Sequence, residues 1–286
     1  RVEPIVVTSP DDLGVPAFVT REGVEVVQPD AFDSWRTQPR FRKGSATMFD
    51  VASFIGHVKR FKDANSMIFA NNDFNQPSMT AVLDYHPAGA ESEPRFGHHR
   101  TNYRFPLDDK WKLWHEFNGK SFSMVDFAHF LESNITDVMP ADYVSVDGDD
   151  ELGRFMKLMG GKEKIADPSV LMSIATGLEV NENSTVSENT KLASGEGLLT
   201  FQSTHETKDA TGAKIKVPTM FALALPVFRN DQPWQVIARL RYRHRPSLTF
   251  SYELWESKRV FDKAFDEVVQ RVQNQTETTV WLGSPE

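Results

Sequence analysis

The sequence predicts an α+β fold: an antiparallel β-meander sheet with packed helices, preceded by an extended N-terminal arm. Short extended runs open the chain, capped amphipathic helices occupy its middle, and strands joined by short turns follow Ser184. Of the 286 residues 40% are hydrophobic and 25% charged, a composition typical of globular proteins. We therefore expect an arm at 1–40, an α/β region with two similar capped helices at 41–150, and helices, an antiparallel meander and a C-terminal helix at 151–286.

The first 40 residues favour extended structure over helix. Prolines recur in them, and a proline inside a helix removes a hydrogen bond and clashes with the preceding turn. These prolines are Pro4, Pro10, Pro16, Pro29 and Pro39. The segment is therefore interpreted as an arm or an edge hairpin.

Two similar helix starts lie between residues 41 and 150. Thr47 is the expected N-cap of the first, with Asp50 three residues later in a shortened capping box. Residues 47–55 align with 123–131, with Met, Asp, Ala and Phe identical. Duplication of a unit is one explanation, and convergence of capped amphipathic helices is the other. Strands are predicted at 66–71 and 79–86, and a short helix at 108–117.

The remaining half begins with helices and turns to strands. Helices are predicted at 151–159 and 169–180. Strands are predicted at 184–192, 197–208, 214–228, 234–244 and 247–255. A helix at 257–272 follows, with one apolar face, and a strand at 278–283 comes last. The residues of that apolar face are Phe261, Ala264, Phe265, Val268 and Val272.

An arginine ladder is the main candidate for a binding face in this acidic chain, whose formal net charge is −8. Alternate residues of a strand share one face, so the four arginines Arg239, Arg241, Arg243 and Arg245 lie together. A turn at 245–247 places Tyr242 opposite Phe250, in the one register that keeps every apolar residue on the other face.

That register also places Arg239 opposite Glu253, which we expect to be its internal partner. The other three arginines are candidates for a phosphate or an acidic partner, because guanidinium groups bind both. The alternative is a solvated sheet face or pairing with distant acids of the same chain.

A cluster of titratable residues is the main candidate for metal chemistry. Asp84, His86, His98 and His99 offer the carboxylate and imidazole groups that transition metals bind. The simpler interpretation is that these histidines form hydrogen bonds with the backbone. No phosphate-binding loop, G-x-S-x-G or H-E-x-x-H motif occurs, so we expect no catalytic residue and no cofactor. The absence of cysteine excludes disulfides, and no apolar run is long enough for a membrane span.

Several strings in the chain resemble the YfdQ family of phage and prophage proteins. They include "TMFDVASFIGHVKRF", "RFGHHRTNYRFPL", "SMVDFAHFLESNI" and "ARLRYRHR". The resemblance implies a phage or prophage origin and the cytoplasm of a bacterial host cell, with a place in a phage assembly allowed. It transfers no catalytic residue.

The expected function is self-assembly without catalysis. An extended arm, a basic strip on an acidic chain and the lack of a catalytic motif favour a ring- or shell-like homo-oligomer that binds macromolecules. The expected partner is the protein itself, with nucleic acid or another phage protein next and no membrane. The alternatives are a DNA-binding accessory factor acting through the arginine ladder, and a metal-dependent hydrolase at the Asp84 cluster.

Overall fold

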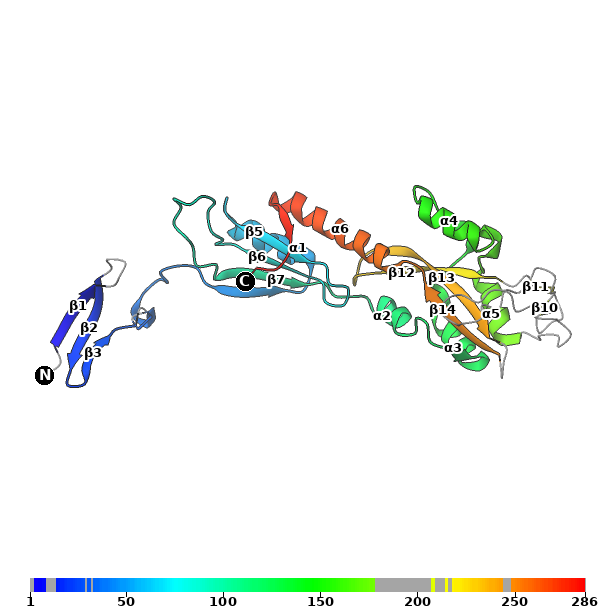
Figure 1. The fold of residues 1–286 in the computed structure, drawn as a ribbon, viewed down its shortest axis with the longest axis horizontal. Coiled ribbons are helices and arrows are strands. Elements are labelled where there is room, and N and C mark those ends of the chain that lie inside the picture. The colour runs from blue at the N-terminus through cyan, green and yellow to red at the C-terminus, as the bar shows by residue number, and fades with distance from the viewer. Residues whose placement is uncertain are drawn as a thin grey trace.

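The computed structural model describes residues 3–8, 14–28, 30–31, 33–177, 207–208, 214–215, 218–243 and 248–285. As predicted, the fold is α+β. The described part contains six α-helices and two five-stranded sheets, together with smaller sheets. Figure 1 shows an elongated molecule in which the N-terminal strands lie at one end and the two larger sheets follow along its length.

The N-terminal residues form a small sheet. Strands β1 (Glu3–Thr8), β2 (Gly14–Thr20) and β3 (Gly23–Val26) pair in an antiparallel meander. A short 3-10 helix η1 (Asp33–Trp35) lies in the connection to the rest of the chain. In Figure 1 this sheet lies apart from the other described elements. The predicted extended conformation is thus organised as three short strands.

The first five-stranded sheet joins residues that are distant in sequence. Its order is β15-β5-β6-β7-β4. The strands are β4 (Gly44–Met48), β5 (Met67–Asn71), β6 (Ser78–Val82), β7 (His99–Arg104) and β15 (Val280–Leu282). The central strands β5, β6 and β7 pair antiparallel, whereas β4 and β15 run parallel to their neighbours β7 and β5. The predicted strand at 79–86 was too long, because β6 ends at Val82 and a turn follows.

The second five-stranded sheet is antiparallel throughout, with the order β8-β14-β13-β12-β9. Its strands are β8 (Phe122–Ser123), β9 (Val138–Met139), β12 (Met220–Pro226), β13 (Pro233–Arg243) and β14 (Thr249–Leu254). The predicted hairpin register is confirmed, with Tyr242 opposite Phe250 and Arg239 opposite Glu253. This register places Leu240, Phe250 and Tyr252 in the core.

Helices pack on both large sheets. Helix α1 (Val51–Phe61) contacts β4 and β7 of the first sheet, and α2 (Asp109–Glu116) and α3 (Met124–Asn134) contact the second. Helix α5 (Pro168–Gly177) packs against α3. Helix α4 (Asp150–Leu158) covers part of the opposite face of the second sheet, where Leu152 and Met156 join Ile237 in a smaller apolar cluster.

Helix α6 (Ser257–Thr276) connects the two sheets. It contacts α1 and β15 at one end and β13 at the other. Its predicted apolar face is confirmed, since all five residues of that face are buried. One continuous core therefore includes residues from both sheets.

The two similar helix starts are capped by different residues. Thr47 was the predicted cap of α1, but it lies in β4, and Asp50 caps the helix by accepting a 2.7 Å hydrogen bond from the Ser53 N–H. In α3 the cap is Ser123, which accepts from the Asp126 N–H at 3.1 Å. The aligned aspartates thus occupy different positions, which favours convergence over duplication.

The remaining described elements are short. They are the 3-10 helices η2 (Ile135–Asp137), η3 (Ala141–Tyr143) and η4 (Lys162–Lys164), and the paired strands β10 (Thr207–Lys208) and β11 (Lys214–Ile215). The strand predicted at 184–192, and 197–206 of the next, lie outside the described residues. The division of the chain at residues 40 and 150 stays a prediction. None of the described helices has the length and apolar character needed to cross a membrane.

Candidate functional site

The N-terminal sheet has one apolar face. Residues that pair across strands share a face, and Ile5 pairs with Ala17, which in turn pairs with Val26. We call the resulting set the arm face: Ile5, Val7, Val15, Ala17, Val19, Val24 and Val26. Glu3 lies at its end, opposite Val19. The other face is mixed: it contains Thr8 and Glu25 together with the exposed apolar residues Val6 and Phe18.

The arm face is uncovered mainly along β3. Val24 is 54% and Val26 48% exposed, whereas Ile5, Val7 and Val15 are half-buried and Ala17 is buried. Neither hydrophobic cluster of the described residues includes a residue of this sheet. Figure 1 shows no described helix or second sheet against it. An apolar sheet face is normally packed on another layer, so this surface has the character of an interaction site.

The arginine ladder is less open than the sequence suggested. The expected partnership of Arg239 with Glu253 was wrong, because the Glu253 carboxylate accepts a 2.7 Å hydrogen bond from Arg241 Nη2 instead. A guanidinium group on a long side chain reaches diagonally to the next pair of a sheet as easily as straight across.

The arginines of the ladder differ in how deeply they are buried. Burial is the main cause that lowers the pKa of Arg239; the neighbouring Arg241 lowers it further and Glu253 opposes the change. Arg239 pairs with Met220, a member of the smaller apolar cluster under α4. Arg243 is exposed, and Arg245 lies outside the described residues. The structure therefore leaves Arg243 as the accessible member among the three described arginines.

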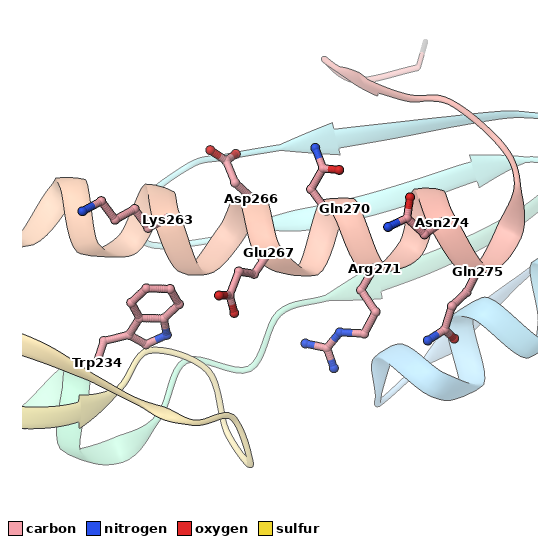
Figure 2. Close-up of a pocket in the computed structure, with 8 residues that line it drawn as sticks. All are labelled: Trp234, Lys263, Asp266, Glu267, Gln270, Arg271, Asn274 and Gln275. Atoms are coloured by element: carbon pink, nitrogen blue, oxygen red, sulfur yellow. The ribbon is translucent and has the colours of Figure 1, made fainter. Parts of the chain in front are cut away.

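The two tryptophans near the ladder pack against other elements. The Trp255 ring stacks on Phe155 of α4 with 4.7 Å between centroids, and the Arg259 guanidinium lies 5.6 Å from its centroid. Trp234 lines an open groove of about 740 Å³ along α6, which Figure 2 shows. The other residues of this groove are polar: Lys263, Asp266, Glu267, Gln270, Arg271, Asn274 and Gln275.

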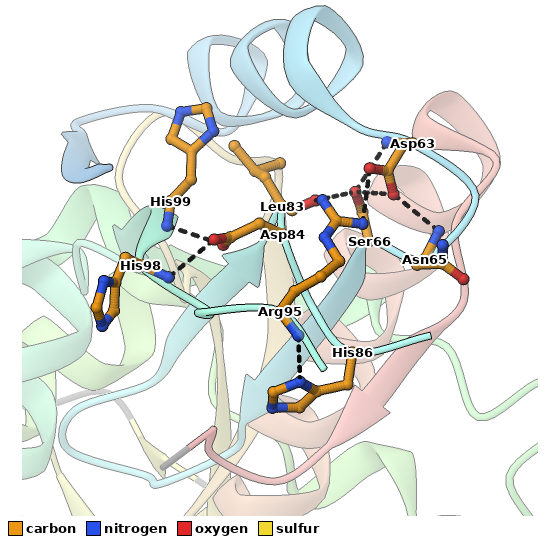
Figure 3. Close-up of polar contacts among 9 residues, drawn as sticks. All are labelled: Asp63, Asn65, Ser66, Leu83, Asp84, His86, Arg95, His98 and His99. Carbon is orange, nitrogen blue, oxygen red and sulfur yellow. Dashed lines mark hydrogen bonds and ion pairs between the residues drawn. The ribbon is translucent and has the colours of Figure 1, made fainter. Parts of the chain in front are cut away.

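The structure brings the backbone of the histidine cluster together but separates the imidazoles. Asp84 accepts hydrogen bonds from the backbone N–H groups of His98 and His99 at 3.1 and 2.8 Å. His86 Nδ1 accepts from the Arg95 N–H at 3.0 Å. Figure 3 shows that the rings of His98 and His99 point away from the carboxylate. Asp84 thus anchors the loop after β6.

An ion pair and a hydrogen bond hold the same loop against the segment that follows α1. The Arg95 guanidinium forms a 2.8 Å ion pair with Asp63, which follows α1, and the Ser66 hydroxyl donates to the Leu83 carbonyl at 2.7 Å (Figure 3). Among the residues that the structure describes, no group of three His, Cys, Asp or Glu side chains is placed to hold a metal ion.

His57 on α1 is a neighbour of His99 that the sequence pattern did not reveal. Their rings lie 6.3 Å apart, with Phe61 close to both, and His57 Nδ1 is 2.8 Å from the Thr101 hydroxyl. Burial is the main cause that lowers the pKa of each histidine. No spacing in the sequence signals this pair, because it depends on how α1 packs on β7.

The arrangement defines an α+β protein with two large sheets, joined by one long helix, and an uncovered N-terminal sheet. Residues 8–285 match the family described as uncharacterized conserved protein (DUF2303), and the chain belongs to this family. No curated protein and no solved structure matches the chain.

Proposed function

We propose that this protein self-assembles, and that the arm face of one copy packs against a neighbouring copy. The observation that carries the proposal is the exposed apolar face of the N-terminal sheet. A three-stranded sheet depends on its hydrophobic face for stability, so a layer that covers this face stabilises it further. Complete burial of one valine stabilises by about 1.5 kcal/mol or more, so covering several of them gives a substantial driving force.

We propose that a second copy of this chain covers the arm face, because the N-terminal sheet offers both an apolar face and open strand edges for contact. Strands β1 and β3 have open edges in their sheet, where a strand of a neighbour adds backbone hydrogen bonds. An arm set apart from the main body reaches a different surface on the next copy. Contacts of that kind generate a ring or a shell where the rotation closes.

We further propose a prophage origin and a location in the cytoplasm of the bacterial host, and the resemblance to YfdQ proteins supports this part of the proposal. On this proposal the main partner is the protein itself, and the assembly is ring- or shell-like. Binding of other macromolecules would then take place on the assembled surface.

The test is the mass of the full-length protein by native mass spectrometry and light scattering. Val24→Asp places a charge in the arm face, so we expect a shift from oligomer to monomer. Thr8→Asp is the matched control, because it adds the same charge to an exposed position on the opposite face. A monomeric unmodified protein at micromolar concentration, or equal loss of mass in both variants, contradicts the proposal.

A DNA-binding accessory role is the second candidate, and the exposure of Arg243 favours it. Binding through this residue would weaken with added salt, because each neutralised phosphate releases counterions. A gel shift that Arg243→Glu leaves unchanged argues against it. The metal-dependent hydrolase at Asp84, His86, His98 and His99 stays a prediction, which elemental analysis of the purified protein tests.

A further inference from the structure

A cleft of about 850 Å³ lies where the first sheet meets the β12–β13 turn and α6. Its walls come from five separate segments of the chain, at 47–51, 78–80, 102–106, 228–231 and 268–271, which only the tertiary fold brings together. The residues that matter below are Phe49, Asp50, Tyr103, Arg104, Arg229, Asp231 and Arg271. A cleft of this size is typical of sites for small ligands.

Three arginines from separate elements line this cleft. Arg104 ends β7, Arg229 lies in the β12–β13 turn, and Arg271 projects from α6, as Figure 2 shows. Arg229 lies 3.8 Å from Asp109. Arg104 and Arg271 form no ion pair with any residue that the structure describes. Exposed guanidinium groups that converge without internal partners are suited to bind an oxyanion.

The cleft also offers a buried acceptor and a donor. Asp231 Oδ1 accepts from the Gln232 N–H at 3.0 Å, while its Oδ2 is buried and has no hydrogen-bond partner within the described part of the chain. A ligand that donates a hydrogen bond to this buried oxygen removes the cost of leaving it without a partner. The Tyr103 hydroxyl remains protonated at neutral pH, because burial foremost, with Asp50 and Asp231, raises its pKa to about 12.

An exposed aromatic ring stands at the edge of the same cleft. Phe49 is 88% exposed although it directly precedes the Asp50 cap of α1. An aromatic face next to cationic groups is the combination by which proteins bind nucleic-acid bases beside their phosphates.

We propose that this cleft binds a nucleoside phosphate, with the phosphate on Arg104 and Arg271, the base on Phe49, and a ligand N–H or O–H donated to Asp231. Arg229 is paired with Asp109, so Arg104 and Arg271 are the two guanidinium groups in the cleft left to bind one phosphate. The same unit occurs in a free nucleotide and in a single strand. This proposal is independent of the arm face.

The test is titration of the full-length protein with adenosine monophosphate, with a short single-stranded oligothymidylate and with inorganic phosphate. We expect Arg104→Gln and Arg271→Gln each to weaken binding about tenfold, the effect of one charge-assisted hydrogen bond. Phe49→Ser should weaken the nucleoside probes and leave inorganic phosphate unaffected. All three side chains are exposed, so the substitutions spare the core.

Arg154→Gln is the matched control, since it removes one exposed arginine from α4 that does not line the cleft. Binding that is lost in this control and kept in the cleft variants overturns the proposal, as does the absence of binding to all three probes. Saturation by the monophosphate identifies a free nucleotide as the source, and binding of the oligothymidylate alone identifies a strand. Light scattering on each variant separates loss of ligand binding from loss of assembly.

Discussion

Asp137 is a buried carboxylate, 2% exposed, that holds α2 against the start of the second sheet. Its Oδ2 accepts a 2.9 Å hydrogen bond from Trp114 Nε1, and its Oδ1 is paired with Lys110. Trp114 is itself fully buried, at 0% exposure. The indole N–H therefore depends on this one acceptor.

We expect Asp137→Ala to destabilise the protein by about 2–3 kcal/mol, because it leaves a buried indole N–H without a partner. The measurement is the free energy of unfolding in urea. Lys112→Gln on the same helix removes an ion pair at the surface and should cause no measurable change. Equal stability of Asp137→Ala and the unmodified protein contradicts this interpretation.

His115 is a second buried polar residue, and it gives stability a pH dependence. Its Nδ1 lies 2.7 Å from the Trp111 carbonyl and donates to it, which leaves Nε2 as the acceptor. Nε2 is buried without a partner in the described part. Burial is the main cause that lowers the pKa of His115, against the hydrogen bond to Trp111.

Because the unfolded chain binds a proton at this histidine more readily than the folded protein, stability should fall as the pH drops below about 6.5. Above that pH the contribution is constant. His115→Asn keeps a donor for the Trp111 carbonyl but does not titrate, so we expect a shallower slope of unfolding free energy against pH. His57 and His99, whose pKa values are also lowered, contribute to the slope in the same direction. An unchanged slope in the variant counts against this assignment.

At the scale of elements, strand alternation was the reliable signal. It predicted the β13–β14 register, because only one pairing keeps Leu240, Phe250 and Tyr252 on the core side. Alternation does not mark the arm face, because apolar residues such as Val6, Pro16 and Phe18 stand between its members, and only the observed pairing assigns the face. Which arginine pairs with Glu253 could not be predicted, because that depends on the conformations that long side chains adopt on one face of the sheet.

Helix starts were less well predicted, since several residues near each start can accept the capping hydrogen bond. We expect Ser123→Ala to destabilise by about 1 kcal/mol, the usual cost of losing an N-cap. Asp50→Ala should also lower the thermal midpoint, whereas Thr47→Ala should not, because Thr47 lies in β4 and does not cap α1. Thermal unfolding of the three variants measures this. A larger effect for Thr47 than for Asp50 contradicts the assigned cap.

At the scale of the whole molecule, pairings between distant segments were beyond prediction from local patterns. Nothing in residues 278–283 indicates that β15 pairs with β5 instead of the second sheet. The short distance between His57 and His99, and the meeting of five segments at the 850 Å³ cleft, also depend on pairings between distant parts of the chain. Local patterns specify which face of an element is apolar, and only the tertiary fold decides which elements meet.

The connection between the N-terminal sheet and β4 should be the first site of proteolysis. Arg36 and Arg40 are exposed there, and Trp35 beside them is 85% exposed. We expect brief trypsin treatment to release the N-terminal sheet and to leave the two-sheet body folded, because no arm residue belongs to its core. Mass spectrometry identifies the cut, and circular dichroism reports the fold. Simultaneous degradation of the body contradicts this expectation.

The parallel pairing of β15 with β5 has a consequence for synthesis of the protein. Residues 44–104 leave the ribosome early, yet the sheet they form gains its edge strand only when residues 280–282 follow. Until then the edge of β5 is open to pair with other strands, as edges of partly folded sheets commonly do. Translation that stops before residue 280 thus yields a chain in which β5 keeps an unpaired edge, however well the other strands of the first sheet have formed.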